Sequence, residues 1–386
     1  MKVVENKMNI MLVNTIYSPF KVGGAEVSVQ LLAEELEKKG NNVTVLALHD
    51  EKKRKVSIIN NVTVVYLPLR NLYWPFDGKQ HSKIKKLFWH IIDNFNPLMA
   101  RSVANELDNF KPDVVHTNNI SGFSVAIWKE IKSRGIKLIH TSRDYYLFHP
   151  NSTMYGANGD LAVDKPVVKL WSFVKKIKSK HIDVYVGISE FIKDFHVENG
   201  FFSKAKKEYI YNSVDIIEFE KKESPFCRVG FIGRLTKDKG FDDFCHYVRE
   251  LKKNNSDIKA FAAGRFNSGS DSLELKTLAE NCAVDLLGFV SLDTFLSSVD
   301  VVVLPVKWRE PFGRVVVESV LAKKIVLTNA VGGITELAKI LPNIHIIDDN
   351  APILLDKLVF KTVGNDAIAI FNPEKIATKY FEAYNI

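Results

Sequence analysis

Short apolar runs rich in β-branched residues alternate with amphipathic stretches along the first 200 residues. Runs of this kind occupy residues 9–15, 43–48, 62–67, 112–117, 136–141 and 183–188. After the first of them, Ala25–Lys39 has apolar residues at helical spacing. Near-continuous apolar strands separated by helices are typical of a parallel sheet that is covered on both faces. The pattern therefore predicts a doubly wound α/β domain.

The same alternation starts again in the second half of the chain. Strand-like runs occupy residues 229–232, 260–263, 285–290, 299–305 and 325–327. We therefore predict two such domains in tandem, residues 1–205 and 206–372, with a C-terminal helix at 373–386 that could pack back on the first. In folds of this kind, ligands bind outside the carboxyl ends of the strands.

Composition excludes several classes of protein. With 46% apolar and 25% charged residues, the chain of 386 residues has an ordinary globular composition. No apolar run approaches the roughly 18–20 residues that cross a bilayer, and the N-terminus lacks the unbroken apolar stretch of a signal peptide. The three cysteines have no C-x-x-C spacing, so neither a disulfide framework nor a zinc site is indicated. We expect a cytoplasmic protein.

The net charge of +8 resides entirely in the first half of the chain. Residues 1–200 contain 28 basic and 20 acidic side chains, whereas residues 201–386 contain 25 of each. Two stretches concentrate the lysines, Lys79–Lys86 and Lys165–Lys180. Both resemble surfaces that rest on anionic lipid headgroups. A packed helix with a solvated basic side explains the second stretch equally well. Nucleic acid is not expected as a partner, because no module that binds it is recognisable.

A glycine pair lies between the first predicted strand and its helix. The strand is not followed by the G-x-G-x-x-G of dinucleotide-binding folds but by Gly23 and Gly24. Glycines let the backbone approach a ligand closely, and the N-terminus of a helix favours an anion. The alternative is a glycine turn without a ligand.

Two cations follow the first strand of the second half. Arg234 and Lys239 lie five residues apart, before a helix that starts near Gly240. At a strand–helix junction, an arginine fork and a lysine point charge can hold a diphosphate. A solvated basic turn is the alternative.

Two glutamates follow the run at 299–305. Glu310 lies in a loop, and Glu318 lies in a helical segment that is otherwise apolar. A carboxylate amid apolar residues is costly unless it is exposed or hydrogen-bonded, and sugar hydroxyls would satisfy it. Taken singly, Glu318 is better explained as an exposed helix carboxylate, and Glu310 as an N-terminal carboxylate that opposes the helix dipole.

The order of these motifs resembles glycosyltransferase family 4, the large family of retaining nucleotide-sugar transferases with the GT-B fold. The resemblance covers nearly the whole chain, with Glu-x7-Glu preceded by Gly-Arg-x4-Lys-Gly. Further motifs in the family's order are GGAE (23–26), PDVVHT (112–117), VGISEFI (186–192), NSVD (212–215), AAGRF (262–266), LLGFVS (286–291) and VGGITE (331–336). The resemblance implies two Rossmann-like domains that face a central cleft. The first would receive the acceptor and the second the nucleotide sugar.

The resemblance also implies roles for single residues. Arg234 and Lys239 would hold the donor diphosphate, Glu310 would contact the transferred sugar, and these three are the candidate catalytic residues. Glu318 would bind the ribose hydroxyls. The remaining matches are Gly23 and Gly24 in a loop that closes over the diphosphate, the backbone at Phe312 and Gly313 near the sugar and phosphate, and Gly264 and Val290 near the base.

The chain departs from the family's pattern at two places. Arg143 precedes Asp144 where many members have histidine, and an arginine cannot act as a base because it stays protonated. It could bind a phosphate or a sugar hydroxyl instead. Lys323-Lys324-Ile325 replaces a glycine and a proline at a helix end. His116, at the end of its strand, is a candidate for the pocket or a histidine of the core.

The resemblance implies transfer of a hexose or N-acetylhexosamine from a UDP-sugar to a lipid-linked saccharide, as in lipopolysaccharide, O-antigen or capsule assembly. No Asp-x-Asp motif is present, so we expect metal-independent transfer with retention and no cofactor. The expected location is the inner face of the cell membrane, with an anionic lipid surface as a partner of the basic first domain. A GDP-sugar (mannosyl-type) transferase, a GT-B sugar-nucleotide epimerase and a non-catalytic binding module are the alternatives.

Overall fold

The chain forms two compact units. The computed structural model describes residues 7–20, 23–156, 158–216, 227–254, 257–267, 271–348 and 355–386. The first unit comprises residues 1–154, 161–213 and 372–386, and the second comprises 155–160 and 214–371. The segment 155–160 therefore belongs to the second unit although its neighbours in the chain belong to the first.

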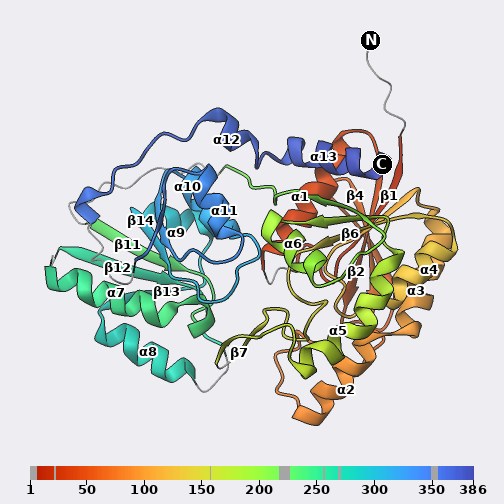
Figure 1. Ribbon diagram of the computed structural model, residues 1–386, viewed down its shortest axis with the longest axis horizontal. Helices are drawn as coiled ribbons and strands as arrows, with labels where there is room; N and C mark the ends of the chain where they lie inside the picture. Colours follow the sequence, from red (N-terminus) through yellow and green to blue (C-terminus); the bar gives the residue numbers. More distant parts are fainter. Residues whose placement is uncertain are drawn as a thin grey trace. The chain divides into compact units, whose positions relative to one another are not determined.

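The first unit is built on an eight-stranded sheet within the described residues, in the order β10-β9-β6-β5-β1-β2-β4-β3 (Figure 1). All neighbouring pairs are parallel except β3 and β4. The strands are β1 (Asn9–Val13), β2 (Asn42–His49), β3 (Lys55–Ile59), β4 (Val62–Pro68), β5 (Val114–Thr117), β6 (Lys137–Ser142), β9 (Val184–Gly187) and β10 (Lys206–Tyr209). The central strands β2, β5 and β9 are buried along nearly their whole length because helices cover both faces of the sheet.

Helices with well-defined starts flank this sheet. They are α1 (Gly24–Lys38), α2 (Lys83–Asn94), α3 (Pro97–Phe110), α4 (Ala126–Ser133), α5 (Pro166–Lys178), the 3-10 turn η1 (Ser179–His181), α6 (Glu190–Glu198) and α13 (Pro373–Asn385). The side chains of Ser82, Asn96, Ser189 and Asn372 cap four of them. The C-terminal helix α13 packs on α1 and adds Tyr380 and Tyr384 to the core of this unit.

The second unit has a six-stranded, fully parallel sheet among its described residues, in the order β13-β12-β11-β14-β15-β16. Its strands are β11 (Cys227–Ile232), β12 (Ile258–Ala263), β13 (Val284–Gly288), β14 (Val301–Leu304), β15 (Ile325–Thr328) and β16 (Ile344–Ile346). Its helices are η2 (Lys237–Lys239), α7 (Phe241–Asn254), α8 (Asp271–Asn281), α9 (Leu292–Ser298), α10 (Arg314–Leu321), α11 (Ile334–Ile340), η3 (Leu355–Lys357) and α12 (Asn365–Ala369). A short hairpin, β7 (Tyr155–Gly156) with β8 (Gly159–Asp160), completes the unit.

Every strand predicted from the apolar runs is present, with ends shifted by a few residues. The strands that the pattern did not predict are β3, β7, β8, β10 and β16. Strand β3 is largely exposed and β10 has the sequence Lys-Lys-Glu-Tyr, so neither has the apolar run of a buried strand. Both lie at the edges of their sheet, where lysines discourage pairing with other chains. No helix in the described part of the chain is long and apolar enough to cross a membrane.

Candidate functional site

The carboxyl ends of β11, β12 and β13 approach one another closely in the second unit. A Cβ atom at Gly264 would overlap the carbonyl oxygen of Gly233, and both glycines have a φ of +147°. The Gly264 N–H also donates to the Gly288 carbonyl at 2.7 Å. Glycine is therefore required at position 264 both for space and for backbone conformation. This edge of the sheet is where ligands bind in such folds.

Arg234 and Lys239 lie on the loop between β11 and α7, and each has an acidic partner. Arg234 Nη2 lies 2.8 Å from Asp238 Oδ2 in an exposed ion pair. Lys239 Nζ lies 2.7 Å from Glu310 Oε2, and both side chains are mostly buried. The lysine is also 4.7 Å from the centre of the Trp308 ring, a cation–π contact. The two predicted cations thus share one short turn, and one of them contacts the first predicted glutamate.

The backbone of Glu310 is tied to the start of α11. The Gly333 N–H donates to the Glu310 carbonyl at 2.8 Å, and a Cβ atom at Gly332 would overlap the same oxygen. The preceding residue, Arg309, forms an ion pair of 3.1 Å with Asp160 of the β7–β8 hairpin. These contacts place the Glu310 carboxylate at the carboxyl end of β14, next to the loop of Lys239.

Helix α10 starts at a glycine in the left-handed region and carries Glu318. Gly313, its N-cap, has a φ of +95°, and the preceding Phe312 is buried. Glu318 Oε1 accepts a hydrogen bond of 2.6 Å from Arg314 Nε one turn earlier, and both side chains are nearly buried. Burial raises the pKa of Glu318, and Arg314 opposes the rise. Glu318 is therefore a buried, paired carboxylate rather than an exposed one.

The residues expected near the base lie on adjacent strands. Gly264 follows β12, and the half-buried Val290 follows β13. Beside Val290, the exposed Phe289 ring has the Arg265 guanidinium 4.4 Å from its centre. Because β13, β12, β11 and β14 are neighbours in the sheet, the structure gathers the predicted second-unit residues at one edge.

In the first unit, Gly23 and Gly24 are exposed at the start of α1. The Gly23 N–H donates to Glu26 Oε2 at 3.0 Å, so a side chain of the first turn already caps this end of the helix. Glu26 itself is buried. An anion at this N-terminus would share it with the Glu26 carboxylate.

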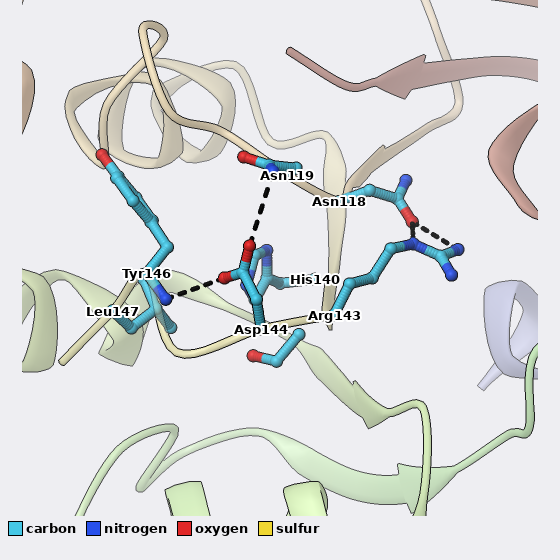
Figure 2. A pocket seen from close by; sticks show the side chains of 8 residues that line it. Asn118, Asn119, His140, Arg143, Asp144, Tyr146 and Leu147 are labelled. Carbon is cyan, nitrogen blue, oxygen red and sulfur yellow. Dashed lines mark hydrogen bonds between the residues drawn. The ribbon is translucent and has the colours of Figure 1, made fainter. Parts of the chain in front are cut away.

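Arg143 and Asp144 follow β6 and line a small cavity of about 10 Å³, room for one water molecule (Figure 2). Arg143 is buried and donates to Asn118 Oδ1 from Nε at 3.1 Å and from Nη2 at 2.9 Å; Nη1 donates to Asn212 Oδ1. Asp144 Oδ1 accepts the Tyr146 N–H at 2.7 Å. The side-chain amide oxygens of Asn118 and Asn212 therefore fix the orientation of the guanidinium.

A buried ionic cluster lies behind this cavity. Lys175 of α5 donates to the Tyr146 carbonyl at 2.6 Å, and Asp93 Oδ2 of α2 accepts from the Tyr146 hydroxyl at 2.9 Å. Burial raises the pKa of Asp144 to about 6 and that of Asp93 to about 6, and lowers the pKa of Lys175 to about 8. The charge of Glu26 adds to the rise at Asp144, which places Glu26 within electrostatic reach of it.

His116 lies in the core of the first unit. Its Nδ1 is 2.8 Å from the Tyr384 hydroxyl and its Nε2 is 2.7 Å from the Thr141 hydroxyl. Burial holds its pKa well below the usual range, so the ring is neutral. Of the two explanations for His116, this geometry favours the core histidine, because both nitrogens already have partners.

The prediction missed the polar groups around Arg143 and Asp144, where Asn118 accepts from Arg143 and Asn119 donates to Asp144. Asn118 and Asn119 directly follow an apolar run. Their place at the carboxyl end of a predicted strand could have indicated that they belong to a site. Lys175 and Asp93 gave no such signal, because a lysine in a basic helix is expected in solvent.

The chain has the GT-B fold. The structure of sucrose-phosphate synthase from Thermosynechococcus elongatus matches it with a TM-score of 0.71 at 16% identity, over 97% of this chain and 98% of that one. The structure of Anabaena HepE matches with a TM-score of 0.65 at 18% identity, over 98% and 99% of the two chains. The predicted fold is confirmed.

The chain belongs to glycosyltransferase family 4 and is a glycosyltransferase. The model described as Glycosyltransferase Family 4 matches residues 22–218, and that of Glycosyl transferases group 1 matches residues 213–358. A 42.6 kDa protein in the cps region of Klebsiella pneumoniae is 48% identical over 98% of this chain and 100% of its own length. A glycosyltransferase of Methanocaldococcus jannaschii is 25% identical over 86% of this chain and 83% of its own.

Proposed function

We propose that the enzyme transfers a hexose or N-acetylhexosamine from a UDP-sugar to a lipid-linked saccharide of a surface polysaccharide, with retention and without a metal ion. The observation that carries the proposal is the Lys239–Glu310 pair beside Arg234, at the edge of the sheet where β11 and β14 end. One similar structure was determined with UDP and glucose, which supports the donor. The relative in the cps region supports a capsule-type acceptor.

The charges of the second-unit site suit departure of a nucleoside diphosphate. Its growing negative charge needs preorganised cations, and Arg234 and Lys239 sit on one short turn. A diphosphate would compete with the carboxylates of Asp238 and Glu310 for these two cations. When Lys239 turns to a phosphate oxygen, the Glu310 carboxylate is released to accept hydrogen bonds from the hydroxyls of the sugar. One exchange of partners would therefore engage both ends of the donor.

The buried carboxylate and the glycines complete the proposed donor site. Glu318 would accept the ribose hydroxyls with the oxygen that Arg314 does not occupy, while the backbone at Phe312 and Gly313 approaches the sugar. Gly264 and Val290, at the ends of β12 and β13, would border the base. Gly264 and Val290 follow β12 and β13, and Phe312, Gly313 and Glu318 belong to the loop and helix that follow β14.

On the acceptor side, Arg143 would bind a phosphate or a sugar hydroxyl and would not serve as a base, since its guanidinium stays protonated. In a front-face reaction with retention, the departing phosphate can take the acceptor proton. Gly23 and Gly24 would close over the diphosphate. We place the reaction at the inner face of the cell membrane, where a lipid-linked acceptor is held.

The proposal is tested by a donor screen. The full chain is incubated with radiolabelled UDP-glucose, UDP-galactose, their N-acetylated counterparts and GDP-mannose, with EDTA, and with or without a bacterial lipid extract. We expect lipid-dependent transfer from one UDP-sugar, with the anomeric configuration of the donor retained in the product by NMR. Transfer from GDP-mannose alone, epimerised nucleotide without transfer, or loss of activity in EDTA would each contradict it.

A further inference from the structure

Helix α5 exposes several large apolar residues and buries a lysine. Leu170 and Phe173 are 71% and 62% exposed, and Ile177 is also exposed. The residues of this helix that face the interior are Val168, Ser172 and Lys175. A helix that covers a core normally has the opposite arrangement, with an apolar stripe inward and lysines outward. The exposed face of α5 is therefore not the solvated basic side of a packed helix.

Helix α2 has the same arrangement. Ile84 is 70% exposed, and Phe88 and Ile91 are about half exposed, whereas Trp89 and Asp93 are buried. Monomeric proteins rarely leave several large apolar side chains in one place without a partner. We use the name α2–α5 surface for Ile84, Phe88, Ile91, Leu170, Phe173 and Ile177.

The two helices are neighbours within the first unit. Helix α2 packs against α5, and the rings of His90 and Trp171 lie 6.2 Å apart between them. Lys178 of α5 reaches over the Phe95 ring just after α2, at 5.1 Å from its centre. Figure 1 shows α2 and α5 side by side. The exposed side chains thus belong to one pair of packed helices.

Lysines accompany this apolar surface, and neither of the two helices carries an exposed carboxylate. Lys83, Lys85 and Lys86 are exposed on α2, whose one acidic residue is the buried Asp93. The sequence of α5 has four lysines and no acidic residue. A second copy of the chain would bring like charges together in a two-fold interface. An anionic lipid bilayer instead provides apolar depth for the large side chains and negative headgroups for the lysines.

We infer that the α2–α5 surface docks on an anionic membrane, with its apolar side chains inserted among the lipids and the flanking lysines on the headgroups. Inward, the same helices provide Asp93 and Lys175, which bind Tyr146 beside Arg143 and Asp144. A docked membrane would therefore lie on the helices that support the loop of Arg143 and Asp144, where the proposed function places the acceptor. Only this last link rests on the proposed function.

Sedimentation with vesicles tests the inference, using the full chain without substrates. The vesicles are phosphatidylcholine alone or with one third phosphatidylglycerol. Leu170→Ser with Phe173→Ser should weaken binding to the anionic vesicles by at least about tenfold, since two large apolar side chains no longer insert. Lys83→Gln with Lys85→Gln and Lys86→Gln should weaken it by about tenfold or more and reduce its salt dependence, because only the lysines of α5 then remain on the headgroups. Leu273→Ser, at an exposed leucine of α8 in the second unit, is the matched control and should bind like the wild type.

Fluorescence quenching and the oligomeric state distinguish insertion into the bilayer from self-association of the chain. Brominated lipids should quench the tryptophan fluorescence of the wild type, and Trp171→Phe should reduce that quenching. Circular dichroism confirms that each variant is folded. Unchanged vesicle binding by the leucine–phenylalanine variant would overturn the inference. The inference would also be overturned if the wild type were a dimer that does not bind vesicles and the leucine–phenylalanine variant were a monomer. UDP binding by the same variants should stay at the wild-type level if they lose only vesicle docking. Loss of docking is therefore distinguishable from loss of the proposed donor site.

Discussion

At the scale of single residues, the cations of the second unit are held by neighbouring carboxylates rather than by solvent. Arg234 pairs with Asp238 across an exposed turn, whereas Lys239 pairs with Glu310 in a mostly buried position beside Trp308. Desolvation strengthens the second pair relative to the first. Removing the charge of Lys239 should therefore lower activity more than removing the charge of Arg234.

Lys239→Ala should lower kcat/KM for the nucleotide sugar by about 10²–10³, the usual loss when a preorganised charge-stabilising group is removed. Lys237→Ala is a matched control, because Lys237 lies in the same turn, is exposed and pairs with Glu274 at 3.0 Å. Steady-state kinetics with the donor identified in the screen provide the measurement. Equal rates for the two variants would remove Lys239 from the site.

The buried Asp93 makes a prediction about stability and pH. Burial raises its pKa from 3.8 to about 6, so between these values the folded state binds more protons than the unfolded state. The contribution of Asp93 to stability is therefore present at low pH and is lost as the pH rises through about 6. Relative to Asp93→Asn, the free energy of unfolding of the wild type should fall on the order of 2 kcal/mol between pH 4 and pH 7. Urea unfolding at several pH values tests this, with Asp164→Asn as an exposed control, and a constant difference would contradict it.

At the scale of elements, the site in the second unit depends on how closely strand ends and loops approach one another. Three glycines make the contacts possible: Gly264 against Gly233, Gly240 against Pro305, and Gly332 against Glu310. Each contact joins two loops that follow different strands. The distances among the predicted site residues therefore depend on residues that have no side chain at all.

Gly264→Ala should destabilise the second unit by more than about 2 kcal/mol, because the new methyl group meets the backbone of Gly233 and the φ of +147° is unfavourable for alanine. Gly288→Ala is the control: it also has a positive φ, of +69°, but its Cβ would meet nothing within 4 Å. That variant should lose only about 1 kcal/mol. Thermal unfolding measures both, and equal losses would show that space at position 264 is not limiting.

At the scale of the whole molecule, distant parts of the sequence complete each unit. Helix α13 returns to the first unit after the whole second unit has been traversed, and residues 155–160 belong to the second unit. Tyr384 of α13 bonds to His116 at the end of β5, a separation of 268 residues. The first unit is therefore incomplete until the last residues of the chain are present.

Tyr384→Phe should cost about 1–2 kcal/mol of stability in the first unit, because it leaves a nitrogen of the buried His116 without this partner. The control is Tyr209→Phe on the edge strand β10, where the side chain is exposed. Hydrogen exchange of strands β5 and β6 localises the loss to this unit. Equal protection in the two variants would show that the Tyr384 bond does not stabilise the core.

Sequence alone determined the architecture and the order of the motifs. Apolar runs of strand length report burial in a parallel sheet directly, so β1, β2, β5 and β11 were predictable, while the exposed edge strands β3 and β10 were not. The candidate residues Arg234, Lys239 and Glu310 were likewise found from their places after strands.

Only the tertiary structure decided what each candidate residue contacts. Lys239 and Glu310 are 71 positions apart in the sequence and are brought together by the adjacent strands β11 and β14, and no local pattern encodes that pairing. The tertiary structure also shows that Lys175 of α5 is buried and that Leu170 of the same helix is exposed. Burial is a property of the assembled unit, because it depends on which elements pack on a helix and not on the helix's own periodicity.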